Sequence, residues 1–152
     1  MAFAQPSLKG RALRLLSQRE HSRVELERKL ATFEEEPGTL ALALDELQAK
    51  GFISEQRVLE SVIHRRAAKL GTARIRQELQ DKGLDRRLIE QAVAELRGNE
   101  LERAREVWRK KFAGSSGSPV EQARQIRFLL TRGFAAEVVR RVVSATGTDA
   151  LE

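Results

Sequence analysis

Apolar side chains recur along the whole chain at intervals of three and four residues. This spacing places them on one face of an α-helix. Glycines and polar turns interrupt the pattern at short intervals, so the predicted helices are short. The stripes are Leu8, Ala12, Leu15 and Leu16; Val24, Leu26, Leu30 and Phe33; Leu40 to Leu47; Val58, Leu59, Val62, Ile63 and Leu70; Ile75 and Leu79; Leu88, Ile89, Ala92, Val93 and Leu96; Leu101, Ala104, Val107, Trp108 and Phe112; Ala123, Ile126, Leu129 and Leu130; Val138, Val139, Val142 and Val143.

Several helix ends carry their own sequence signals. Side chains that can cap a helix N-terminus precede four stripes: Ser22 with Glu25, Asp85, Asn99 with Glu102, and Ser118-Pro119 with Glu121. Glycines that can take positive φ follow other stripes: Gly51, Gly83 and Gly133. Gly71 interrupts a helix expected over residues 54–69. With few glycines, few prolines and few β-branched runs, these signals predict an all-α protein.

One helix-glycine-helix pattern occurs twice. The stretch RIRQELQDKGLDRRLIEQAV (74–93) is followed by RQIRFLLTRGFAAEVVRRVV (124–143), with Gly83 aligned to Gly133 and Leu79 to Leu129. We therefore expect three tandem units of three helices, over residues 8–53, 54–98 and 99–145, followed by a frayed tail at 146–152. Because short helices bury their apolar faces against neighbours, such units stack into an elongated, slightly curved body.

The residues required for common catalytic and metal sites are missing from the sequence. There is no cysteine, and no phosphate-binding glycine loop or hydrolase motif occurs. The two histidines, His21 and His64, are too few for a histidine zinc site, and we expect both at the surface or half-buried. Carboxylates have basic neighbours at helical spacing, which predicts ordinary ion pairs. We expect a protein that is not an enzyme and has no cofactor.

The chain also lacks a signal-peptide core and an apolar run long enough to cross a bilayer. Together with the absence of cysteine, this predicts a soluble, cytoplasmic protein without a membrane partner, expected to be a monomer.

Charge is distributed unevenly along the chain. The net charge is +6, yet residues 1–53 carry eight basic and eight acidic side chains. The whole excess therefore lies in the last two units, which favours an anionic partner such as nucleic acid or an acidic protein surface. The alternative is a solvated surface of mixed charge, since arginine is also a good helix former.

Arginine is the most frequent cation here, and its planar fork binds phosphate or carboxylate with two bonds. The candidate partner-binding residues lie on predicted helix faces or at helix ends away from the apolar stripes. They are Arg65, Arg66, Arg74, Arg76, Arg109, Lys110, Lys111, Arg124, Arg127, Arg132, Arg140 and Arg141. Trp108 lies on an apolar stripe, so we interpret it as a core residue rather than a stacking platform.

Four stretches in order resemble the RecX family of bacterial RecA regulators. They are ALRLLSQREHSRVELERKL (12–30), LQAKGFISEQRVLESVIHRRA (47–67) and the two repeated segments above. The specific elements are Arg-Lys-Leu after the capping box, Gly-x-x-x-Ile-x-x-Glu-Leu at 71–79, and Arg-Gly-Phe at 132–134. The resemblance covers about residues 10–145.

The resemblance implies three tandem three-helix repeats and a cytoplasmic protein that binds the RecA–DNA nucleoprotein filament. It also implies that the protein limits filament growth and suppresses ATP hydrolysis and strand exchange. Some members of this family bind DNA directly, so the partners it implies are the RecA filament and single- or double-stranded DNA. The family supplies no catalytic residues. A basic helical protein that binds DNA without RecA, and a passive helical scaffold, stay open as alternatives.

Overall fold

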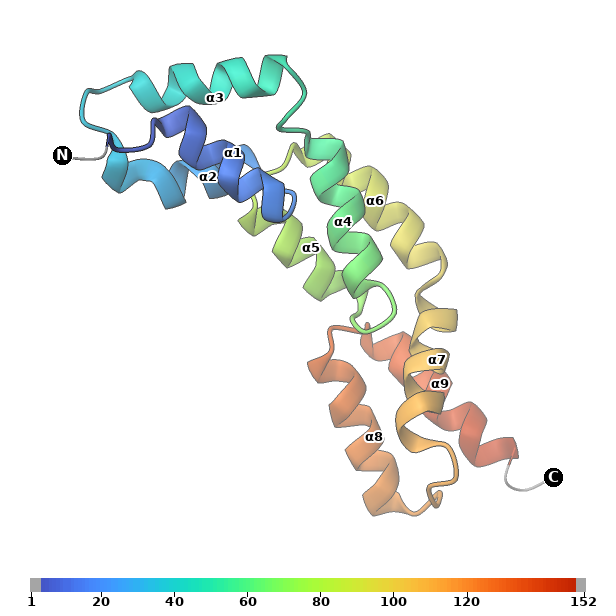
Figure 1. Cartoon of the computed structure of the whole chain (residues 1–152). Coiled ribbons are helices and arrows are strands. Elements are labelled where there is room, and N and C mark those ends of the chain that lie inside the picture. The colour runs from blue at the N-terminus through green and yellow to red at the C-terminus, as the bar shows by residue number, and fades with distance from the viewer. Residues whose placement is uncertain (1–3, 150–152) are drawn as a thin grey trace.

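The computed structural model describes residues 4–149, with side chains up to residue 145. This part of the chain forms helices in three consecutive groups (Figure 1). Unit one contains α1 (Leu8–Gln18), α2 (Arg23–Leu30), the 3₁₀ turn η1 (Ala31–Phe33) and α3 (Thr39–Ala49). Unit two contains α4 (Glu55–Arg66), α5 (Thr72–Asp81) and α6 (Arg86–Gly98). Unit three contains α7 (Glu100–Phe112), α8 (Pro119–Thr131) and α9 (Ala136–Asp149).

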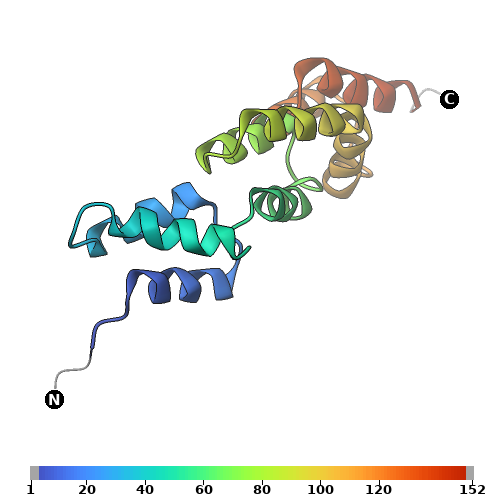
Figure 2. The ribbon, with the colours of Figure 1, turned by 90° about the horizontal axis from the view of Figure 1, so that it is seen from above.

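Each unit has its own hydrophobic core. Leu26, Leu44 and Leu47 are fully buried in unit one, Val62, Ile75 and Leu79 in unit two, and Ala104 and Leu129 in unit three. The units follow one another in an elongated, bent body with unit one and unit three at its opposite ends (Figures 1 and 2). The expected all-α, elongated fold of three-helix repeats is confirmed. Burial of separate small cores explains why the chain extends instead of collapsing into one globule.

Most of the predicted end signals act as expected. The Ser22 hydroxyl accepts a hydrogen bond from the Glu25 N–H at 3.1 Å, and the Glu25 carboxylate accepts one from the Ser22 N–H at 3.1 Å. This is a complete capping box. Ser118 caps α8, with Pro119 as its first residue. Gly51, Gly83 and Gly133 have φ values of 82°, 69° and 93°, a region that favours glycine.

The repeated glycine brings neighbouring units into contact. A Cβ on Gly83, in the turn after α5, would lie 2.3 Å from a methyl carbon of Val24 in α2. A Cβ on Gly133, in the turn after α8, would lie 2.2 Å from Cγ of Arg74 in α5. In both cases the turn of one unit packs against the middle helix of the preceding unit. Glycine is therefore needed for close approach as well as for its backbone conformation.

Charged groups hold unit one against unit two. The Glu25 carboxylate accepts hydrogen bonds from Arg19 in unit one at 2.8 Å and from Lys82 in unit two at 3.0 Å. Burial opposes ionisation of Glu25, but the bonds from Arg19, from the Ser22 backbone and from Lys82 outweigh it. They lower the pKa of Glu25 from 4.5 to about 2. Arg57 adds a second link through its 2.9 Å contact with Glu20.

Three details of the predicted helices are wrong. The side chain of Asn99 does not cap α7, because its Oδ1 atom accepts a hydrogen bond from Arg103 instead. In α8 the expected inward residues Ala123 and Leu130 are exposed, and Gln125 is buried instead. Gln125 can be buried because its side-chain oxygen accepts a hydrogen bond from the Trp108 indole N–H at 3.0 Å. The helix expected over 54–69 ends at Arg66 and continues as a turn.

Two residues of unit one also differ from expectation. Phe33 was expected on the apolar face of the second helix, but that helix ends at Leu30 and Phe33 is 46% exposed. The expected position of His21 is at the surface or half-buried, but its side chain is only 1% exposed. It can be buried because its ring is satisfied, with Nδ1 bonded to the Arg19 carbonyl at 3.0 Å and Nε2 to Lys29 Nζ at 3.2 Å. Burial lowers the pKa of His21.

Candidate functional site

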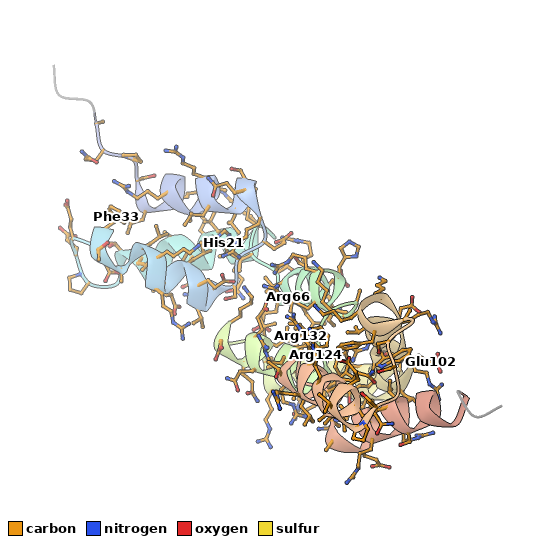
Figure 3. All side chains as sticks on the ribbon, turned by 90° about the horizontal axis from the view of Figure 1, so that it is seen from below. His21, Phe33, Arg66, Glu102, Arg124 and Arg132 are labelled. Atoms are coloured by element: carbon orange, nitrogen blue, oxygen red, sulfur yellow. The ribbon has the colours of Figure 1, made fainter. Side chains whose placement is uncertain are left out.

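A groove lined by seven cations and two carboxylates, Glu78 and Asp81, runs across the contact between unit two and unit three. We call it the basic groove. It consists of two adjoining hollows that share Arg132. Its cations come from α4 and the turn that follows it, from α5, and from the end of α7 to the turn after α8. They are Arg66, Lys69, Arg74, Lys111, Arg124, Arg127 and Arg132. Figure 3 shows Arg66, Arg132 and Arg124 close to one another in the middle of the body.

The unit-two side of the groove is fixed by contacts to the backbone and to one carboxylate. Arg66 Nε donates to Glu78 Oε1 at 3.0 Å, which joins α4 to α5. Arg74 donates from its NH1 nitrogen to the carbonyl oxygen of Thr131 at 2.9 Å, across to the end of α8. This bond satisfies a carbonyl at a helix C-terminus, where a cation is also favoured by the helix dipole.

The unit-three side contains an aromatic ring that contacts two cations. The guanidinium carbon of Arg132 lies 4.8 Å from the centre of the Phe128 ring, and Lys111 Nζ lies 5.2 Å from it. Both distances are within the range of cation–π attraction. Phe112 packs edge-on against the same ring, with 5.4 Å between ring centres. The ring thus holds two cations beside each other at the surface.

The twelve cations predicted from the sequence fall into three groups. Six lie in the basic groove: Arg66, Arg74, Lys111, Arg124, Arg127 and Arg132. Arg65 lies at its edge, 3.8 Å from Glu78. Five lie elsewhere: Arg76, which pairs with Glu90 of α6; Arg109, which pairs with Glu106 on its own helix; and the exposed Lys110, Arg140 and Arg141.

Sequence analysis missed two contributors to the basic groove. Lys69 follows the Arg65-Arg66 pair in the turn after α4, so the local run of basic residues was a usable signal. Phe128 lies four residues before Arg132, the helical spacing at which an aromatic ring and a cation meet. Its ring lines the second hollow beside Lys111.

Two glycines allow the groove to form. A Cβ on Gly71 would lie 2.2 Å from the carbonyl carbon of Gly133, so no larger residue fits at this position without a shift. The Gly71 N–H donates to the Arg132 carbonyl at 2.8 Å. Gly71 has an ordinary φ of −75°, so its role is close approach, not an unusual backbone conformation. The contact places the start of α5 against the turn after α8.

A buried carboxylate holds the same junction. Glu100, at the start of α7, is 4% exposed and accepts a hydrogen bond from the Thr72 N–H at 2.7 Å. Its other oxygen accepts one from the Ala135 N–H at 3.4 Å. One carboxylate thus bonds to N–H groups at the starts of α5 and α9, in two different units. The expectation that carboxylates only form ordinary ion pairs is wrong for Glu100.

Arg103 completes this support from the next turn of α7. Its guanidinium donates to the carbonyl oxygens of Ala67, Leu70 and Leu96 at 3.0, 2.6 and 3.2 Å, and to the Thr72 hydroxyl at 3.0 Å. Burial lowers the pKa of Arg103, while the nearby Glu100 charge opposes this shift. The turn between α4 and α5, which carries Lys69, is therefore fixed by a side chain of unit three.

The described residues contain no group of three or more His, Asp or Glu side chains that could hold a metal ion. In the same part of the chain, no helix is both long and apolar enough to cross a membrane. The chemistry that the basic groove offers is binding of an anionic surface by several guanidinium and ammonium groups.

Comparisons with known proteins give a consistent result. The family model of the second three-helix domain of RecX matches residues 54–93, and that of the third matches residues 99–143. The regulatory protein RecX of Leptothrix cholodnii is 53% identical over 139 residues, which cover 91% of this chain and 88% of that protein. The regulatory protein RecX of Ralstonia nicotianae is 43% identical over 145 residues, covering 95% and 90%.

Solved structures share the fold. A crystal structure of RecX from Lactobacillus salivarius aligns with a TM-score of 0.71 at 21% identity, covering 91% of this chain and 93% of that chain. A second crystal structure of regulatory protein RecX aligns with a TM-score of 0.72 at 21% identity, covering 89% and 70%.

Proposed function

The chain belongs to the RecX family of regulatory proteins, and from this premise we propose that it binds RecA filaments on DNA in the cytoplasm. There it restrains filament extension, ATP hydrolysis and strand exchange. It acts by binding, without catalysis of its own. The basic groove between unit two and unit three is the contact surface.

The observation that carries this proposal is the convergence of seven cations in one groove of an elongated body. A filament repeats the same anionic groups along its length, so a long protein can contact more than one subunit at once. Each contact then holds the next one near its site, which raises the overall affinity without a new kind of bond. A compact protein with the same charge would reach fewer neighbouring sites.

The direct test is a titration of the purified protein into RecA assembled on single-stranded DNA, with ATP hydrolysis as the readout. We expect the rate of ATP hydrolysis to fall as the protein is added, at molar amounts no greater than that of RecA. Unchanged hydrolysis and unchanged strand exchange at a molar excess of this protein would contradict it.

A second candidate function is direct binding of DNA without RecA. It is favoured by the Phe128 ring, which lies within cation–π distance of both Lys111 and Arg132, because cations beside an aromatic ring suit a nucleic-acid strand. Under this alternative, affinity for duplex DNA falls with salt with a log–log slope of about −0.9 per phosphate neutralised. Tight binding to filaments together with weak binding to bare DNA at physiological salt favours the first function.

A further inference from the structure

Unit one has no net charge over residues 1–53, yet its cations are not equally paired. Four of its eight basic side chains form ion pairs with carboxylates: Lys9, Arg19, Arg23 and Lys50. Arg28 donates to the carbonyl oxygen of Asp81 in unit two. No carboxylate lies within 4.0 Å of the side chains of the other three, which are Arg11, Arg14 and Lys29, among the described residues. Five acidic side chains of unit one form ion pairs with other cations instead.

These three unpaired cations line one groove, which we call the unit-one groove. It lies between α1 and the end of α2 with η1. Its apolar surface comes from Leu15 and the half-exposed Phe33, above the buried Leu30. No carboxylate lines this hollow among the described residues, but Glu35 and Glu36 line the adjoining hollow, which shares Arg11 and Phe33 with it. Phe33 lies at the end of the body away from Arg66, Arg124 and Arg132 (Figure 3). The unit-one groove is therefore separate from the basic groove.

The geometry leaves donors available in the unit-one groove. The Arg11 guanidinium lies 3.8 Å from the centre of the Phe33 ring and donates one hydrogen bond to Gln5. Lys29 uses one of its three N–H bonds toward His21 Nε2. Arg14 is exposed, and its guanidinium has no hydrogen bond or ion pair to another described residue; its backbone carbonyl accepts a bond from the Ser17 hydroxyl. Several charged donors thus surround the apolar surface of Leu15 and Phe33.

We propose that the unit-one groove binds an acidic peptide segment that carries a bulky aliphatic side chain. The carboxylates of such a segment match Arg11, Arg14 and Lys29, and its aliphatic side chain covers the strip formed by Leu15 and Phe33. A nucleic acid could pair its phosphates with the same cations, but it has no aliphatic side chain to cover Leu15, and the oligothymidine probe described below distinguishes the two ligands. The charge and the apolar strip together select the peptide.

The test uses the whole chain described above, without RecA or DNA, so its result is independent of the function proposed above. The probe is a short fluorescein-labelled peptide of Asp and Glu around two central Leu residues, and binding is measured by fluorescence anisotropy. Two comparison probes are the same peptide with Ser in place of Leu and an oligothymidine of equal charge. The variants are Arg14→Glu and Phe33→Ser, with Arg86→Glu on the exposed start of α6 as a charge-matched control.

Binding of the Leu peptide is expected to be saturable, and Arg14→Glu is expected to weaken it by about fivefold or more, because an attraction becomes a repulsion. Arg86→Glu is expected to have no comparable effect. Phe33→Ser is expected to abolish the preference for the Leu peptide over the Ser peptide. Absence of saturable binding, equal weakening by Arg86→Glu, or tighter Arg14-dependent binding of the oligothymidine would each overturn the proposal.

Discussion

The backbone N–H of Gly71 donates a hydrogen bond to the carbonyl oxygen of Arg132 at 2.8 Å, joining unit two to unit three in the middle of the basic groove. Beside it, Arg74 of α5 bonds to the Thr131 carbonyl at 2.9 Å. The cations of the two units therefore share a groove because two backbone segments touch. The shape of the proposed contact surface depends on this junction as much as on the cations themselves.

Replacement of Gly71 by alanine is expected to destabilise the protein. The new Cβ would lie 2.2 Å from the Gly133 carbonyl carbon, so the junction has to open. Overpacking of this kind costs about 1–3 kcal/mol of unfolding free energy, measurable by urea denaturation. Gly98→Ala is the matched control, because nothing lies within 4 Å of its added Cβ at the end of α6. It is expected to leave stability equal or slightly higher. Equal effects of the two substitutions would contradict this account of the junction.

Replacement of Glu100 by glutamine is expected to weaken the same junction. A glutamine amide offers one acceptor oxygen, whereas the carboxylate accepts from both the Thr72 and Ala135 N–H groups. Loss of one buried hydrogen bond and of the charge near Arg103 corresponds to about 1–3 kcal/mol. Urea denaturation measures the loss. Glu102→Gln, with a side chain that is 75% exposed, serves as the control and is expected to change stability by less than about 0.5 kcal/mol.

Acid is expected to weaken the link between unit one and unit two. Because the folded pKa of Glu25 is about 2, below its ordinary value of 4.5, its stabilising effect is complete above pH 4.5. The effect is lost as the pH falls from 4.5 toward 2, and it amounts to at most about 3 kcal/mol. The test is to measure the unfolding free energies of the wild type and of Glu25→Gln from about pH 6 to about pH 2.5. The two free energies are expected to converge at the acid end, where Glu25 becomes protonated.

Lys82→Met tests the cause of this acid sensitivity. It removes one of the two cations that bond to Glu25 and leaves the other, Arg19, in place. On acidification, the unfolding free energy of this variant is expected to fall by less than that of the wild type, but by more than that of Glu25→Gln. If Glu25→Gln keeps the full acid dependence of the wild type, the attribution to this carboxylate is wrong.

Much of the fold could be predicted from local sequence signals. The capping box at Ser22, the Ser118-Pro119 helix start and the glycine stops depend on neighbours a few residues away, and each is confirmed. The errors arose where distant contacts decide. Asn99 gives its side chain to Arg103, and Gln125 is buried because the Trp108 indole satisfies it.

The candidate site was less predictable for the same reason. The sequence indicated cationic helix faces, but the groove exists only where α5 meets the turn after α8. Arg74 and Arg76 are two residues apart, yet Arg74 lines the basic groove while Arg76 pairs with Glu90 on α6. Glu100 had no distinctive sequence signal, because its partners, Thr72 and Ala135, lie 28 and 35 residues away.

We propose that the protein restrains RecA through the basic groove. The most direct measurement is a titration of RecA-dependent ATP hydrolysis on single-stranded DNA with Arg124→Glu/Arg127→Glu in the groove and Arg140→Glu/Arg141→Glu on α9. All four arginines are exposed, and the two double substitutions change the net charge by the same amount. We predict that the groove variant requires a concentration about tenfold higher or more for the same inhibition, because two attractions become repulsions. The α9 variant is expected to inhibit like the wild type. Full inhibition by the groove variant, with the fold intact by circular dichroism, would contradict the account.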